Sequence, residues 1–312
     1  WEFRMRIAFL GNFGASFSSE SHHKKTLENL GHEVIALQEV ETTGERVLEV
    51  AEASDALVWV HTHGWDTPGL RMAQVLSTLK DKGIPTLTYH LDLWFGLQRQ
   101  RDMQSDDYWN IGHFFTVDKK MADWFNEETS VKGHYMPAAV YDVECYWNPA
   151  PPERDLIFVG SRGYHPEWPY RPQLIDWLGS NYGHRFTHFG GDGAGVMRGA
   201  DLNRLYASTK VAIGDTLCIN FDYPYYFSDR VFETLGRGGF IIHPRIKGIE
   251  DIFEDKKHLV LYDYGDFDQL KREIDFYLEA DELREEIRKA GHEHVKKNHT
   301  YLNRWTSILE SL

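Results

Sequence analysis

The fold of this chain is decided by residues 227–244, Phe-Ser-Asp-Arg-Val-Phe-Glu-Thr-Leu-Gly-Arg-Gly-Gly-Phe-Ile-Ile-His-Pro. Ser228 and Asp229 are both suitable N-caps for the short helix that follows them. Glycines at positions 236, 238 and 239 end that helix and lead into an almost wholly apolar strand. A helix joined through a glycine turn to a buried strand is the repeating unit of an α/β fold.

The same alternation extends in both directions from this segment. Strands that are nearly all apolar and separated by amphipathic helices are typical of a parallel sheet covered on both faces. The first half predicts strands at 6–10, 33–37, 56–60, 84–89 and 113–117, and helices near 20–30, 45–53, 68–82 and 118–127. The second half predicts strands at 155–160, 185–189, 210–214, 239–243 and 258–262, and helices near 170–179, 200–208, 229–236, 266–279 and 281–312, the last broken near 298–300.

A proline-rich segment, Asn-Pro-Ala-Pro-Pro-Glu at 148–153, separates the two halves. Prolines at this density continue neither a helix nor a central strand, so the segment is expected to link a domain at 1–150 to a second that begins at 151. The sequence predicts two Rossmann-like, doubly wound α/β domains facing a cleft. In such sheets, ligands bind beyond the carboxyl ends of the strands.

Composition excludes several classes of protein. The 312 residues carry 34 Lys and Arg against 48 Asp and Glu, a net charge of −14, which disfavours an extensive contact with DNA or anionic lipid. No apolar run approaches the ~20 residues of a membrane span, and no signal peptide is recognisable. Two cysteines provide no disulfide framework, which indicates a reducing compartment, and we expect the cytoplasm. Residues 1–4 look like an addition before a natural start at Met5.

Three motifs follow predicted strands in the first half. The loop Gly-Asn-Phe-Gly-Ala-Ser at 11–16, with Gly14, allows the backbone to approach a phosphate or sugar, but it is neither a dinucleotide fingerprint nor a P-loop, and a plain turn is the alternative. His90 and Asp92 follow the fourth strand and could bind a sugar and act as a general base. His61 and His63 could bind a metal, but no third ligand is evident, so we favour an acceptor site there.

Arginines and a carboxylate mark the second half. Arg162 and Arg171 lie after the strand at 155–160, where guanidinium groups could hold a diphosphate, although either could be a surface ion pair. The helix capped by Ser228 would present its N-terminus to an anion. Glu233, on that helix, could accept hydrogen bonds from a ribose diol.

The segment from Arg230 to Ile242 resembles the nucleotide-sugar signature of GT-B glycosyltransferases, and specifically the "glycosyl transferases group 1" C-terminal domain in its CgeB-like branch. Phe158-Val-Gly-Ser, Phe189-Gly-Gly and Ala200-Asp-Leu-Asn-Arg-Leu-Tyr extend the resemblance over nearly all of 155–299. The resemblance implies a nucleotide-sugar domain at 151–299 and a helix at 300–312 that crosses back to the N-terminal domain.

The resemblance also implies roles for individual residues. Glu233 would bind the ribose, Arg162 and Arg171 the diphosphate, and the loop 190–197, with Val196, the base. Ser228, Arg230 and the Gly14 loop would complete the site for a nucleoside diphosphate sugar, with a UDP-sugar favoured as donor. His90 would contact the donor sugar. No metal cofactor is expected, because basic side chains and helix N-termini stabilise the leaving diphosphate in such enzymes.

Two departures from the family pattern affect the expected stereochemistry. Retaining members often carry Glu-x7-Glu, with the first carboxylate near the sugar, whereas the residues seven and eight before Glu233 are Tyr226 and Tyr225. The lysine that usually follows the Gly-Arg diphosphate motif is also missing. If the enzyme inverts, Asp92 is the first candidate for the general base and His63 the second.

The leading hypothesis is therefore a metal-independent glycosyltransferase, a hexosyl- or pentosyltransferase, that moves a sugar from a nucleoside diphosphate to an acceptor hydroxyl. Tryptophans and tyrosines in predicted loops fit a glycan, a small molecule or a modified nucleobase as acceptor. The alternatives are a non-catalytic, two-lobed sugar- or ligand-binding protein and a nucleotide-sugar epimerase of the same fold. An epimerase would require further carboxylates, which the sequence does not reveal.

Overall fold

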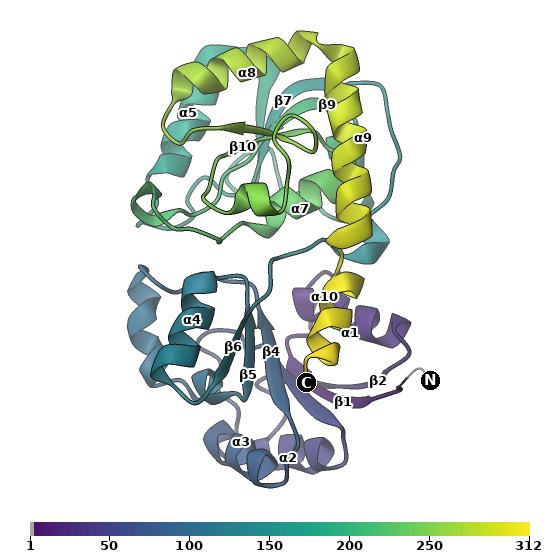
Figure 1. Cartoon of the computed structure of the whole chain (residues 1–312), viewed down its shortest axis with the longest axis vertical. Helices are drawn as coiled ribbons and strands as arrows, with labels where there is room; N and C mark the ends of the chain where they lie inside the picture. The colour runs from purple at the N-terminus through teal and green to yellow at the C-terminus, as the bar shows by residue number, and fades with distance from the viewer. Residues whose placement is uncertain (1–2) are drawn as a thin grey trace. The chain divides into compact units, whose positions relative to one another are not determined.

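The structure is a computed structural model that describes residues 3–312; Trp1 and Glu2, part of the segment expected to precede the natural start, lie outside the described residues. The chain forms two compact units (Figure 1). The first unit contains the residues up to Pro137 and also Tyr301–Leu312 at the end of the chain. The second unit is Ala138–Thr300. The change of unit thus comes at Pro137, and the proline-rich segment 148–153 runs as an irregular stretch inside the second unit.

The first unit is built on a six-stranded parallel sheet with the order β2-β1-β3-β4-β5-β6. Its strands are β1 Arg6–Gly11, β2 Glu33–Gln38, β3 Ala56–Trp59, β4 Thr86–His90, β5 His113–Thr116 and β6 Lys132–Tyr135. Its helices are α1 Ser19–Asn29, α2 Gly44–Glu52, α3 Met72–Asp81, α4 Lys119–Glu128 and α10 Tyr301–Glu310, with short 3-10 turns η1 Gln98–Gln104 and η2 Asp107–Asn110. Strand order reverses between β1 and β3, which makes this a doubly wound sheet.

The second unit repeats that strand order in five parallel strands, β11-β10-β9-β7-β8. The strands are β7 Arg154–Val159, β8 Phe186–Phe189, β9 Thr209–Ile213, β10 Ile241–Pro244 and β11 Val260–Tyr262. The helices are α5 Tyr170–Tyr182, α6 Gly199–Ala207, α7 Asp229–Gly236, α8 Phe267–Glu279 and α9 Asp281–Asn298, with 3-10 turns η3 Asp142–Glu144, η4 Gly183–Arg185, η5 Ile219–Phe221 and η6 Ile249–Asp251. Here the order reverses between β7 and β9, and a ligand is expected beyond the carboxyl ends of those two strands.

Apolar strands and capped helices explain why these residues fold this way. The four central residues of β1, 7–10, are completely buried, as are Leu57 and Val58 of β3, because helices cover both faces of the sheet. Thr43 and Asp118 cap their helices by accepting a hydrogen bond from a backbone N–H in the first turn.

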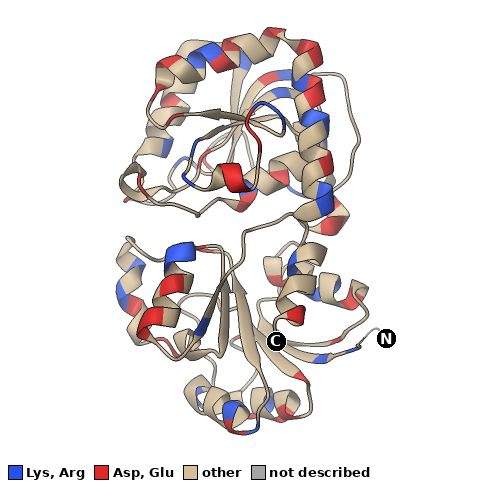
Figure 2. Cartoon of the chain, in the orientation of Figure 1, with Lys and Arg blue, Asp and Glu red and all other residues tan. Residues whose placement is uncertain are grey.

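Charges of both signs are interspersed over the helices of each unit, including α8 and α9 (Figure 2). Within residues 3–312 no helix combines the length and the hydrophobicity needed to traverse a lipid bilayer.

Candidate functional site

The second unit has a cavity of about 140 Å3 where its strand order reverses. It is lined by the carboxyl ends of β7 and β9 and by the first residues of α7. The lining residues are Phe158–Ser161, Tyr164, Arg171, Ile213–Asp215 and Ser228–Arg230. Of the residues predicted from the sequence to bind the donor, the structure brings Arg171, Ser228 and Arg230 together here.

Arg171 is fixed by a buried ion pair. Its Nε donates to Oδ2 of Asp215 over 2.8 Å, and the indole Nε1 of Trp168 donates to the same oxygen over 2.9 Å. The Asp215 side chain is fully buried, and burial raises its pKa in spite of the neighbouring guanidinium. The Arg171 guanidinium also lies 4.0 Å from the ring centre of Tyr164, a cation–π contact.

The start of α7 places the other donor candidates. The hydroxyl of Ser228 caps the helix by accepting from the backbone N–H of Arg230 over 3.2 Å. The Ser228 N–H in turn donates to Oγ1 of Thr216 over 3.1 Å, which ties the cap to the segment after β9. One turn later, Glu233 forms an ion pair with Arg230, with 3.2 Å between Nη1 and Oε2. Glu233 is therefore connected to the cavity through Arg230.

Arg162 and Val196 do not line this cavity. The exposed Arg162 side chain pairs with Asp176, with 2.6 Å between Nη2 and Oδ2. The carboxylate of Asp192 accepts from the backbone N–H groups of Arg162 and Gly163, so it joins the loops after β7 and β8. Val196 is exposed in the second of these loops.

The loop from β9 to α7 holds three non-glycine residues with positive φ, Asn220, Phe221 and Tyr225. Such strained backbone is concentrated at functional sites. At the two positions where the resemblance implied a carboxylate for a retaining enzyme, the Tyr225 hydroxyl donates to Oδ2 of Asp251 over 2.6 Å, and Tyr226 is buried. The structure thus supplies no carboxylate at these two positions.

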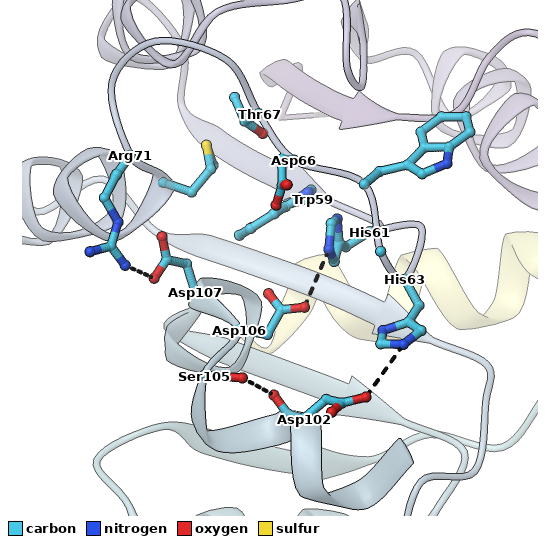
Figure 3. A pocket seen from close by; sticks show the side chains of 13 residues that line it. Trp59, His61, His63, Asp66, Thr67, Arg71, Asp102, Ser105, Asp106 and Asp107 are labelled. Atoms are coloured by element: carbon cyan, nitrogen blue, oxygen red, sulfur yellow. Dashed lines mark hydrogen bonds and ion pairs between the residues drawn. The ribbon is translucent and has the colours of Figure 1, made fainter. Parts of the chain in front are cut away.

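In the first unit, a larger cavity of about 470 Å3 lies beside the loop that follows β3 (Figure 3). Its wall carries His61 and His63, the carboxylates of Asp66, Asp102, Asp106 and Asp107, and Arg71. Arg71 is paired to Asp107 over 2.9 Å. Carboxylates and imidazoles accept hydrogen bonds from hydroxyl groups, so this wall suits a polyhydroxylated compound.

His61 sits between two carboxylates. Its Nδ1 contacts Oε1 of the buried Glu39, and its Nε2 lies 3.4 Å from Oδ2 of Asp106. Burial alone would lower the pKa of His61, but the hydrogen bonds and charges of Asp106 and Glu39 outweigh burial and raise it to about 9. Glu39 also accepts from Trp59 Nε1 and from the Thr62 N–H, so it fixes the start of the loop after β3.

His63 faces the same cavity as a half-exposed side chain, with Nε2 3.6 Å from Oδ2 of Asp102 (Figure 3). A half-exposed imidazole that lines a cavity beside a carboxylate is a candidate general base. Sequence reasoning named His63 but not Asp102 or Asp106, which come from the segment around η1 and η2. The sequence gives no local signal for this pairing, because it joins segments about 40 residues apart.

His90 is buried, and neither it nor the exposed Asp92 lines this cavity. The Nδ1 of His90 lies 3.2 Å from the Tyr108 hydroxyl, and its Nε2 has no hydrogen-bond partner among the described residues. Burial lowers the pKa of His90 to about 4, against the charge of Asp92, so the ring is neutral at pH 7.

Gly14 is exposed in the loop between β1 and α1, where its N–H donates to Oδ1 of Asn12 over 3.1 Å. It also lies outside the lining of both cavities. Within residues 3–312, no group of three or more His, Cys, Asp or Glu side chains is arranged to hold a metal ion.

Comparisons with known proteins identify the fold. Residues 165–310 match a family model described as glycosyl transferase-like. No protein with curated annotation matches the chain by sequence.

Three solved structures are similar over nearly the whole chain. An alpha-glucosyltransferase in complex with UDP-glucose and DNA containing an abasic site has a TM-score of 0.70 at 11% identity, with 99% of each chain covered. Anabaena Alr3699/HepE in complex with UDP-glucose has a TM-score of 0.65 at 13% identity, covering 99% of this chain and 100% of that one. Sucrose-phosphate synthase from Thermosynechococcus elongatus has a TM-score of 0.64 at 12% identity, covering 99% and 98%.

These comparisons confirm the predicted fold: the chain has two Rossmann-like domains of the GT-B type. They also confirm the resemblance to glycosyl transferases at the level of the family model.

Proposed function

We propose that this chain is a glycosyltransferase that moves a sugar from a UDP-sugar to an acceptor hydroxyl. The observation that carries the proposal is the cavity of the second unit, which combines Arg171, Arg230 and the capped start of α7 where the strand order reverses. Cationic side chains and helix N–H groups at such a point are suited to a diphosphate. The structures of HepE and the alpha-glucosyltransferase, which share this fold, hold UDP-glucose.

Each donor contact is assigned to a residue. Arg171 and Arg230 hold the diphosphate, and Arg162 joins them by leaving its exposed pair with Asp176, an exchange that costs little at a solvated surface. Glu233 accepts the ribose hydroxyls, and its pair with Arg230 holds the carboxylate in position. The loop with Val196 covers the base, and Gly14 approaches the donor through its backbone.

The diphosphate leaves with its charge stabilised by the arginines and the α7 N–H groups, so the proposed reaction is metal-independent. His90 contacts the donor sugar as a neutral imidazole, because its pKa of about 4 leaves it uncharged at pH 7. If the reaction inverts the anomeric centre, Asp92 or His63 removes the acceptor proton; the pairing of His63 with Asp102 inside a cavity favours His63.

The acceptor binds the first unit, at the cavity that carries His61 and His63. Its hydroxyl belongs to a glycan, a small molecule or a modified nucleobase. We further propose that the chain belongs to the CgeB-like branch, transfers a hexose or a pentose, and works in the cytoplasm, where its buried thiols Cys145 and Cys218 would stay reduced.

The direct test is release of UDP from UDP-glucose and other UDP-sugars in the presence of a panel of acceptors. We expect release by the wild type and a loss of at least about tenfold in Glu233→Ala, because a charged hydrogen-bond partner of the ribose is removed. Glu250→Ala removes an exposed carboxylate of the same unit and serves as the control. Binding of UDP without release from any donor would indicate a binding protein instead.

A further inference from the structure

A second cavity of the first unit, of about 350 Å3, lies at the amino-terminal ends of strands in the same sheet. It is formed where β4, β5 and β6 begin, by residues 83–86, 110–113 and 130–132, together with Leu76 and Lys80 of α3 and with Leu312. The histidine-bearing loops considered above follow the carboxyl ends of the strands. Because catalytic ligands of doubly wound sheets bind at the carboxyl ends, this cavity is separate from the proposed transfer site.

The charged side chains that line this cavity are both basic. Lys80 and Lys132 both line it, and neither forms an ion pair with another residue between 3 and 312. No aspartate or glutamate side chain contributes to the lining. In a chain with 48 acidic and 34 basic residues, a cavity whose charged side chains are two lysines is a distinct local environment.

The rest of the wall is apolar. Leu76, Ile111 and Val131 are buried side chains that belong to the core and form the floor. Ile84 and Pro85 are half-buried and continue this surface. An apolar floor with a few charged groups at one side is the usual composition of a small-molecule site.

His113 adds a hydrogen-bonding group. Its ring stacks on His134, with 3.2 Å between Nδ1 and the His134 Nε2. Burial and the charge of Lys132 lower the pKa of His113, so the imidazole is neutral at pH 7 and the positive charge of the cavity comes from the lysines.

We propose that this cavity is a binding site for a small amphipathic anion, with the acidic group of the ligand directed to Lys80 and Lys132 and its apolar body on Leu76, Ile111 and Val131. The site requires neither a nucleotide nor an acceptor, so the proposal is independent of glycosyl transfer. A ligand bound there contacts the first residues of three neighbouring strands and stabilises the first unit by mass action.

A matched pair of fluorescent probes tests the proposal. The first, 8-anilinonaphthalene-1-sulfonate, is an amphipathic monoanion, and the second, N-phenyl-1-naphthylamine, has the same aromatic body without the charge. We expect one saturable site for the sulfonate. In Lys80→Gln/Lys132→Gln its affinity should fall about tenfold or more, because two charge-assisted contacts are lost, while the neutral probe binds as before.

Two further variants locate the site. Lys25→Gln/Lys247→Gln removes the same charge at exposed positions elsewhere and should leave the sulfonate affinity unchanged. Ser130→Trp places a large side chain at the exposed rim of the cavity and should weaken both probes. The proposal is overturned if both lysine double variants bind the sulfonate equally, if the neutral probe is lost in parallel in Lys80→Gln/Lys132→Gln, or if UDP displaces the sulfonate. Thermal unfolding of each variant checks that it is folded. If a double variant does not fold, the corresponding single lysine substitutions are used in its place.

Discussion

At the scale of single residues, the histidines of the first unit show how position sets charge. His61 and His90 are both largely buried, yet the pKa of His61 rises to about 9 while that of His90 falls to about 4. The difference comes from partners, since His61 lies between Glu39 and Asp106, whereas His90 has a hydroxyl and aromatic rings around it. At pH 7 the first unit thus holds His61 as an imidazolium and His90 as a neutral imidazole.

The raised pKa of His61 predicts a pH dependence of stability. Histidine in the unfolded chain has a pKa of about 6.5. Below that pH, His61 is protonated in both the folded and the unfolded chain, and its contribution to the free energy of unfolding is fully present. Above it the unfolded chain loses the proton first, so the free energy of unfolding should fall by roughly 3 kcal/mol between pH 6.5 and 9. Urea unfolding across this range measures the slope. In His61→Gln the slope should be much shallower, and an unchanged slope would show that other groups cause it.

Substitutions of two arginines in the second unit are predicted to lower the free energy of unfolding by different amounts. Arg171→Gln leaves the carboxylate of Asp215 buried without its cation, so we expect a loss of about 3–5 kcal/mol in the free energy of unfolding. Arg162→Gln breaks an exposed pair and should leave stability unchanged within error. Denaturant unfolding of the two variants compares them directly. Equal effects would mean that the Arg171–Asp215 pair does not stabilise the second unit.

At the scale of elements, apolar runs were enough to predict every strand except β6. That strand reads Lys-Gly-His-Tyr, lies at the edge of its sheet and is not fully buried, so it lacks the apolar signal of the central strands. The helix predicted from 68 begins only at Met72, because Gly69 has a φ of 77° and interrupts the helical path.

The donor cavity was more predictable than the histidine cavity. Arg171, Ser228 and Arg230 follow strands or begin a helix, and topology brings such positions together. The charge of His61 is determined by Glu39 and Asp106. These residues lie in segments far from His61 in the sequence and contact it only because the chain folds. No periodicity or motif encodes that contact, so it could be found only in the folded chain.

The packing of the last helix, α10, in the first unit can be tested by a substitution. Trp305 is completely buried, and its Nε1 donates to Nδ1 of His23 on α1 over 3.0 Å. Trp305→Ala should lower the free energy of unfolding by about 3–5 kcal/mol, because it leaves a cavity and an unpaired imidazole. Thr306→Ala, at the exposed next position, is the matched control for chemical denaturation. A small loss for Trp305→Ala would show that α10 contributes little to this unit.

At the scale of the whole molecule, two doubly wound units with the same strand order are joined in a chain of net charge −14. Figure 2 shows acidic and basic residues mixed over both units. This charge disfavours an extensive contact with DNA, so we predict weak binding of duplex DNA, although an alpha-glucosyltransferase that shares the fold has been solved in complex with DNA. Fluorescence anisotropy with a short labelled duplex should give a Kd weaker than about 100 μM at physiological salt. Micromolar binding with a steep salt dependence would contradict this prediction and favour a nucleobase acceptor.

The central claim, that the second unit binds the nucleotide of a sugar donor, is tested most directly by thermal unfolding with UDP, GDP, ADP, dTDP and CMP. A nucleotide at 100 times its Kd adds about 2.7 kcal/mol of stability, a rise of a few degrees in Tm. We predict this rise for UDP with the wild type and Glu250→Ala, and its loss in Glu233→Ala. If none of the nucleotides raises the Tm of the wild type, the proposed glycosyltransferase activity is wrong, and a two-lobed protein that binds some other ligand takes its place.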